Sequence, residues 1–192
     1  TFIIEFQYFI DNLKNGDFDN IYHEHYNYWN IHSLKIFFEK LGYPISRVER
    51  IDTHGGSIRA YINKNKKIDD DSLDIMLSEE KEFGINDYKK LSQYAEDITM
   101  NRKKTLDKIN NFKKEGKKII GYGAPAKATT LLNFFGINSN QIDSIIEDNP
   151  LKVNMIIPGT GIKIISKKDL KIKPDIVIVF AWNFYDSIIK NN

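Results

Sequence analysis

The residues best suited to chemistry lie close together near the start of the chain. Three of the four histidines fall in DNIYHEHYNYWNIHS, residues 19–33, beside Glu24 and a run of aromatic residues. Imidazole titrates near neutral pH and a neighbouring carboxylate can fix its tautomer, so His25 with Glu24 has the make-up of a general base. The hydroxyl of Tyr22 could stabilise an oxyanion.

Two other interpretations of this segment stay open. The H-x-H spacing lacks the i, i+4 pairing of a helical zinc site and the sequence offers no other clear ligand cluster, so we expect no metal. A buried aromatic cluster without a catalytic role fits the spacing at least as well, because Tyr26, Tyr28 and Trp29 follow directly. We expect His23 to be structural and His32 to have no specific role.

A glycine-rich segment, GYGAPAK at residues 121–127, lies between an expected strand and an expected helix. Gly121 and Gly123 would let the backbone approach a ligand closely, and Pro125 suits a first helical turn. A phosphate there would meet free amide donors around Ala124 and the positive end of the helix.

The same segment formally matches G-x-G-x-x-A, and Asp148 follows at about the distance of the ribose-binding acid of a dinucleotide fold. Two features are unusual for a dinucleotide fingerprint: Pro125 lies inside the loop, and Lys127, which would add a charge, comes just after it. These features favour a phosphate or sugar-nucleotide site. The motif alone is weak, because glycines also occur where only a tight turn is needed.

The first part of the chain is expected to form a strand, two helices and a hairpin. Apolar spacing predicts a strand over residues 1–6, a helix over 8–16, a second helix from Ser33 as N-cap to Gly42, and a hairpin over 46–64.

Two further helices are predicted over residues 69–116, divided at Gly84 and Asn86, with Asn86 or Asp87 capping the second. Their charged residues are more typical of a solvated face than of a binding patch. Residues 117–192 alternate between strands and helices, which predicts a small parallel sheet with helices on its faces. The expected strands span 117–123, 142–148, 161–166 and 174–182, the last of them buried.

Composition argues against several classes of protein. With 28 Lys and Arg against 26 Asp and Glu, there is no electrostatic case for nucleic-acid binding. The absence of cysteine excludes disulfides and Cys-ligated zinc and is compatible with a reducing cytoplasm, where we expect the protein. No run approaches the roughly 20 apolar residues of a membrane span. The chain opens at Thr1 in a strand-like run, so we expect a piece of a longer protein.

Four segments, taken together and in order, resemble one family. They are FDNIYHEHYNYW, THGGSIRAYI, GYGAPAKATTLLNFFGI, and IEDNPLK followed by IPGTGIKIIS and PDIVIVFAWNF. The series is similar to that of the sugar C-methyltransferases, S-adenosylmethionine-dependent enzymes that methylate a carbon of a nucleotide-linked keto-deoxysugar. The resemblance extends over nearly the whole chain and implies an α/β protein.

The resemblance also implies a division into parts. Residues 1–63 would be the end of a class I methyltransferase fold, 64–116 a helical connecting arm, and 117–192 a Rossmann-like C-terminal domain that helps to hold the sugar nucleotide. Family members also carry a Cys-ligated zinc domain and a glycine-rich loop that grips S-adenosylmethionine, and neither matches this sequence. We therefore expect the zinc and the main cofactor site outside the chain, and no methyl transfer by this chain alone.

In this family a carbon beside a ketone must lose a proton before it attacks the sulfonium methyl, so the site needs a base and an oxyanion donor. The matching residues are His25 as the expected base, Glu24 as the group that orients it, and Tyr22 beside them; the reverse assignment of His25 and Glu24 stays open. The guanidinium of Arg59 could form two parallel hydrogen bonds with a diphosphate, or it could be ion-paired within its strand. The expected substrate contacts are His54, Gly55, Ser57, Arg59, Gly121, Gly123, Ala124, Pro125, Lys127 and Asn183.

Two other functions compete with this one. An NAD-dependent oxidoreductase would use the glycine loop for its cofactor, but the sequence lacks a second recognisable catalytic set. A non-catalytic sugar-nucleotide binding module would use YHEH only for packing. An exposed sheet edge in residues 1–63 could also lead to a homo-oligomer.

Overall fold

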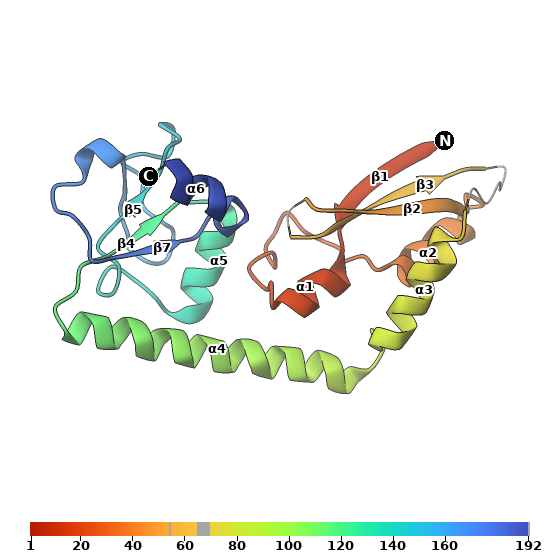
Figure 1. Cartoon of the computed structure of the whole chain (residues 1–192), viewed down its shortest axis with the longest axis horizontal. Helices are drawn as coiled ribbons and strands as arrows, with labels where there is room; N and C mark the ends of the chain where they lie inside the picture. Colours follow the sequence, from red (N-terminus) through yellow and green to blue (C-terminus); the bar gives the residue numbers. More distant parts are fainter. Residues whose placement is uncertain (54, 65–69, 192) are drawn as a thin grey trace. The chain divides into compact units, whose positions relative to one another are not determined.

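The structure is a computed structural model that describes residues 1–53, 55–64 and 70–191 (Figure 1). It contains a three-stranded antiparallel sheet, a four-stranded parallel sheet and several helices. The α/β class that the sequence predicts is therefore confirmed. None of the helices in these residues has both the length and the apolar run needed to cross a bilayer.

The chain folds as two compact units. Unit 1 comprises Thr1–Phe18 and His25–Asp97, and unit 2 comprises Asp19–Glu24 and Ile98–Asn192. Residues 16–30, which form no helix or strand and which we call the His loop, are thus divided between the two units.

Unit 1 holds the antiparallel sheet, with strand order β1-β3-β2. The strands are β1 (Phe2–Gln7), β2 (Ile45–Ile51) and β3 (Ser57–Ile62), and the helices are α1 (Phe9–Asn15), α2 (Ile31–Lys40) and α3 (Ser72–Phe83). The predicted strand, helices and hairpin are confirmed. The predicted N-cap of α2 is wrong: Asn30 is the cap, because its side chain accepts a hydrogen bond from the Ser33 amide at 2.7 Å and the two residues form a capping box.

One face of this sheet forms the core of unit 1. Ile58, Ala60 and Ile62 of the central strand β3 are all buried, because alternate side chains of a strand point to the same face. Buried residues of α2 and α3, such as Leu34 and Met76, belong to the same apolar cluster. The two helices therefore cover the buried face of the sheet.

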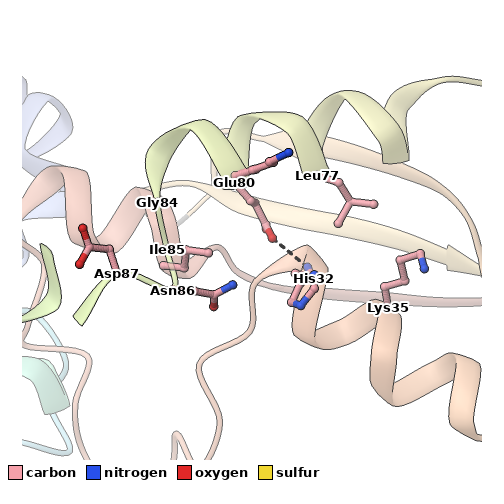
Figure 2. A pocket seen from close by; sticks show the side chains of 9 residues that line it. His32, Lys35, Leu77, Glu80, Gly84, Ile85, Asn86 and Asp87 are labelled. Carbon is pink, nitrogen blue, oxygen red and sulfur yellow. Dashed lines mark hydrogen bonds between the residues drawn. The ribbon is translucent and has the colours of Figure 1, made fainter. Parts of the chain in front are cut away.

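A buried carboxylate, that of Glu80 in α3, ties the start of α2 to this core. Glu80 is 1% exposed and accepts hydrogen bonds from the Ile31 amide, from the His32 amide at 2.8 Å (Figure 2) and from the Tyr8 hydroxyl at 2.9 Å. A helix N-terminus leaves such amides without an intrahelical partner, and its partial positive charge favours a carboxylate. Burial, and then the charge of Glu80, raise the pKa of Tyr8, so its hydroxyl remains a donor.

The long helix α4 (Tyr88–Lys114) follows α3 after a turn at Gly84, as predicted. Of the two expected caps, Asp87 is used, since its carboxylate accepts an amide of the first turn at 2.9 Å. Only Ile98 and Ile109 of this helix are buried, which agrees with a solvated charged face.

Unit 2 holds the parallel sheet, with strand order β6-β5-β4-β7. The strands are β4 (Ile119–Tyr122), β5 (Ile145–Ile146), β6 (Ile164–Ile165) and β7 (Ile176–Val179); the helices are α5 (Ala126–Phe135), α6 (Tyr185–Asn191) and the short 3₁₀ helices η1 (Lys167–Asp169) and η2 (Trp182–Phe184). The predicted parallel sheet is confirmed. The prediction that the last strand is buried is wrong, because β7 lies at the sheet edge and its Val177 is 47% exposed.

Removal of the Glu80 carboxylate should destabilise unit 1. Glu80→Ala leaves a buried hydroxyl and two helix amides without their acceptor, so we expect a loss of about 3–5 kcal/mol in the free energy of unfolding. Tyr8→Phe removes one of the three hydrogen bonds and should cost about 1–2 kcal/mol. Urea titration followed by circular dichroism measures both losses.

The control is Glu79→Ala, at the neighbouring position of α3. The Glu79 side chain is 49% exposed and pairs with Arg50 at 3.4 Å, so its loss should change the stability by no more than about 0.5 kcal/mol. A Glu80→Ala protein as stable as the control would contradict the role given to this carboxylate.

Candidate functional site

The order of the parallel strands in unit 2 creates a switch point. After β4, the strands β5 and β6 are added on one side of it, whereas β7 is added on the other side. Open α/β sheets bind ligands at the carboxyl ends of their strands, where the chain connections diverge in this way. The segments that leave β4 and β7 at this edge are residues 123–127 and 180–183.

Two of the residues predicted from the sequence meet at this edge. Lys127 lies in the first turn of α5, and Asn183 lies in η2, just after β7. The Lys127 ammonium donates a hydrogen bond to the Asn183 side-chain carbonyl at 3.3 Å and lies 4.4 Å from the centre of the Trp182 ring. A half-buried cation and a side-chain amide are therefore placed together where a ligand oxyanion could be bound.

Packing accounts for both glycines of the loop. A Cβ on Gly121 would lie 2.6 Å from carbon atoms of both Ile145 and Phe180. Gly123 has a φ of +81°, and a Cβ there would lie 2.7 Å from that of Ala181. Each glycine is thus required by its neighbours, so neither is by itself evidence of a bound ligand.

The Ala124 amide is not one of the free donors expected at this loop. It donates to the Glu147 carboxylate at 2.7 Å, and the Lys152 ammonium donates to the Ala124 carbonyl at 2.9 Å. The chain's own carboxylate therefore lies where a phosphate was expected. Pro125 is the N-cap of α5 rather than a residue of its first turn, which begins at Ala126.

The part of the His loop that belongs to unit 2 carries Tyr22 and Glu24. Tyr22 is half-buried, and its ring lies 6.0 Å from that of His23. Burial, and then the charges of Glu24 and Asp19, raise the pKa of Tyr22. A tyrosine hydroxyl is protonated at neutral pH even without this shift, so it can donate a hydrogen bond to an oxyanion.

His25 begins the part of the loop that belongs to unit 1. Its half-buried ring meets the Tyr28 ring edge-on, with 6.5 Å between centroids, and Tyr28 in turn lies 5.9 Å from the Phe9 ring at the start of α1. Aromatic contacts of this kind restrict where the imidazole can lie. That Glu24 orients His25 stays a prediction.

Arg59 is ion-paired within the sheet of unit 1. In the register of the strands it lies opposite Glu5 of β1 and Glu49 of β2, and its guanidinium is 3.0 and 3.7 Å from their carboxylates. The hydrogen bond with Glu5 is the main cause that raises the pKa of Arg59. Of the two roles that the sequence left open, the structure shows the ion pair.

The other residues predicted near the hairpin turn make contacts within unit 1. Ser57 is buried, and its hydroxyl donates to the Thr53 carbonyl at 3.0 Å. The Gly55 carbonyl accepts a hydrogen bond from the Asn15 side chain at 3.0 Å. His54 lies outside the described residues.

A cavity of about 460 Å³ lies in unit 1 between the start of α2 and the end of α3 (Figure 2). The most buried polar residue of its lining, Glu80, is already bonded to the start of α2, and none of the predicted catalytic or substrate-binding residues lines the cavity, so we do not assign the function to it. The lining residues are His32, Lys35, Leu77, Glu80, Lys81, Gly84, Ile85, Asn86 and Asp87. Among the described residues, no three His, Asp or Glu side chains gather as a metal site would require.

Two residues of this region escaped the sequence-based prediction. The Trp182 indole N–H donates to the Asp19 carboxylate at 2.9 Å, although the two are 163 positions apart. The available signal was that Trp182, one of only two tryptophans, directly precedes Asn183 at the end of an expected strand.

The parallel sheet and its switch point define an α/β domain of the Rossmann-like class. The chain belongs to the C-methyltransferase family: the model of the C-methyltransferase C-terminal domain matches residues 52–192. The chain is also 32% identical over 193 residues to C-methyltransferase NovU of Streptomyces niveus, a match that covers 99% of this chain and 46% of that protein. It thus spans about half the length of this relative. The resemblance seen in the four sequence segments is confirmed.

Gly121→Ala tests whether packing is the reason for this glycine. The added methyl would overlap Ile145 and Phe180, so we expect a loss of about 1–3 kcal/mol in unfolding free energy. Ala126→Ser, at an exposed position of the same segment, is the control and should change the stability by no more than about 0.5 kcal/mol. Thermal unfolding measures both, and equal melting temperatures would show that the space beside Gly121 is not filled as described.

Proposed function

We propose that this chain is the C-terminal portion of an S-adenosylmethionine-dependent C-methyltransferase that acts on a carbon of a nucleotide-linked keto-deoxysugar. Membership of the C-methyltransferase family supports the reaction class. The observation that carries the site is the make-up of the His loop, in which Tyr22 and His25 are both half-buried and Glu24 directly precedes His25 in the sequence. An acid, a carboxylate and an imidazole are the groups that enolate formation requires.

In the proposed reaction, His25 takes a proton from the carbon beside the substrate ketone. The C–H electron pair moves into the enolate, whose oxygen accepts a hydrogen bond from the Tyr22 hydroxyl. Glu24 stabilises the imidazolium that results. S-adenosylmethionine, when bound, supplies the methyl group: a carbon–carbon bond forms and the sulfur–methyl bond breaks.

The sugar nucleotide is proposed to bind at the switch point of unit 2. Lys127 and Asn183, paired at 3.3 Å, are the proposed diphosphate contacts. The guanidinium of Arg59 is already engaged by two carboxylates, and the Ala124 amide by Glu147, which makes both weaker candidates. The main S-adenosylmethionine site and the zinc are proposed to lie in a part of the protein outside this chain.

An NAD-dependent oxidoreductase is the weaker alternative. The Glu147 carboxylate already accepts the Ala124 amide, one of the donors that a dinucleotide pyrophosphate at the glycine loop would use. Asp148, the candidate ribose ligand, accepts a hydrogen bond from the Tyr122 hydroxyl at 2.8 Å. Both acids therefore already have partners within the chain.

Replacement of the proposed base tests the mechanism in a C-methyltransferase that contains this chain. His25→Asn should lower kcat by about 100-fold to 10,000-fold, the range for loss of a general base, whereas His23→Asn should behave like the unaltered enzyme. Methyl transfer is followed by mass spectrometry of the sugar product. Unchanged turnover by His25→Asn would remove the base hypothesis, and a larger loss from Glu24→Gln than from His25→Asn would reverse the two roles.

Calorimetric titration of this chain tests where the ligands bind. We expect heat of binding with a thymidine-diphosphate sugar, and none with NAD or S-adenosylmethionine. Lys127→Met should weaken sugar-nucleotide binding by about tenfold, because it removes one charge-assisted contact. Binding of NAD alone would instead identify the glycine loop as a dinucleotide site and overturn the proposed substrate.

A further inference from the structure

Asp19, near the start of the His loop, depends on an indole for its hydrogen bonding. The carboxylate is 5% exposed, and its Oδ2 accepts a hydrogen bond from the Trp182 Nε1–H at 2.9 Å. Its Oδ1 is buried and has no hydrogen-bond partner among the described residues. Within the described part of the chain, the Trp182 N–H is therefore the one donor to this buried carboxylate.

Trp182 is itself held at the switch point of unit 2. It is the first residue of η2, and the chain just before it is fixed to β4 by the hydrogen bond from the Phe180 amide to the Tyr122 carbonyl at 2.9 Å. The ammonium of Lys127 lies 4.4 Å from the centre of its ring, in cation–π contact. The indole N–H thus projects from a fixed edge of the sheet.

Asp19, which Trp182 holds, lies a few residues before the proposed oxyanion donor Tyr22 and the proposed base His25 in the sequence. Asp19 precedes Tyr22 by three residues, and all of residues 19–24 belong to unit 2. The loop has no helix or strand hydrogen bonds of its own to set its position. The hydrogen bond to Asp19 is a contact from outside the loop that can set it.

We propose that Trp182 is a positioning residue for methyl transfer: its indole N–H holds Asp19 and thereby fixes residues 19–24, the part of the His loop that presents Tyr22 and Glu24 to the substrate. The inference rests on the proposed function. It gives the C-terminal sheet a part in catalysis as well as in binding the nucleotide. Without the N–H, the buried carboxylate has no donor among the described residues, so we expect residues 19–24 to shift and bring it to water or to another donor.

The test uses Trp182→Phe in a C-methyltransferase that contains this chain. Phenylalanine keeps an aromatic ring for Lys127 and removes the donor. Because a displacement of about 1 Å at the reacting groups can cost about 100-fold, we expect kcat to fall by about 10-fold to 100-fold, with an unchanged KM for the sugar nucleotide. The matched control is Tyr185→Phe, which removes the polar hydrogen of a 52% exposed aromatic residue three positions on and should leave both constants unchanged.

Variants at Asp19 test the same contact from the other side. Asp19→Asn keeps an oxygen that can accept from the indole and should retain most of kcat, whereas Asp19→Ala should lose as much as Trp182→Phe. Because both changes break one contact, the double variant Trp182→Phe with Asp19→Ala should be no slower than either single variant.

A kcat equal to that of the unaltered enzyme in Trp182→Phe would overturn the inference, and so would a raised KM with unchanged kcat, which would make Trp182 a substrate contact. If circular dichroism shows that Trp182→Phe does not fold, the two Asp19 variants test the inference instead. Equal activity of Asp19→Asn and Asp19→Ala would then overturn it. His25→Asn in the same assay separates the two proposals. Normal turnover there defeats the proposed function, whereas its loss together with a normal Trp182→Phe defeats only this inference.

Discussion

The His loop forms no helix or strand, so its position depends on contacts with the rest of the chain, and a buried carboxylate takes part near each of its ends. After the loop, the buried Glu80 carboxylate accepts hydrogen bonds from the first amides of α2 and from the Tyr8 hydroxyl. Because Tyr8 lies between β1 and α1, Glu80 links these two elements to α2. Near the beginning, Asp19 is held by Trp182. The carboxylates of Glu80 and Asp19 are both almost completely buried, and a buried carboxylate needs hydrogen-bond donors to offset the cost of its burial.

The parallel sheet places its chemistry at one edge for a topological reason. Because β4 and β7 are parallel neighbours, the segments that follow them begin at the same edge of the sheet, and β5 lies on the other side of β4. Lys127 and Trp182 come from these two connections and meet there. The edge thus combines a cation suited to a phosphate with the donor of the hydrogen bond to Asp19.

Carboxylates inside the chain already engage some residues whose type would suit a ligand. Arg59 stands between Glu5 and Glu49 on the neighbouring strands, and the Ala124 amide faces Glu147. A guanidinium or an amide attracts any nearby anion, whether that anion belongs to a ligand or to the chain itself. Residue type therefore suggested these two contacts, while the strand register and the short loop after β5 determined their partners.

The sequence by itself determined the class of fold, most helices and strands, and the family, because these follow from local apolar spacing, from capping and turn residues, and from the order of four motifs. It also singled out Lys127 and Asn183, which lie near the ends of expected elements. Only the tertiary structure decided that Asp19 is held by Trp182, that Glu80 supports the start of α2, and that β7 is an edge strand. These are contacts between residues far apart in the chain, and the pairing of distant residues is set by how the elements pack, which local periodicity does not encode.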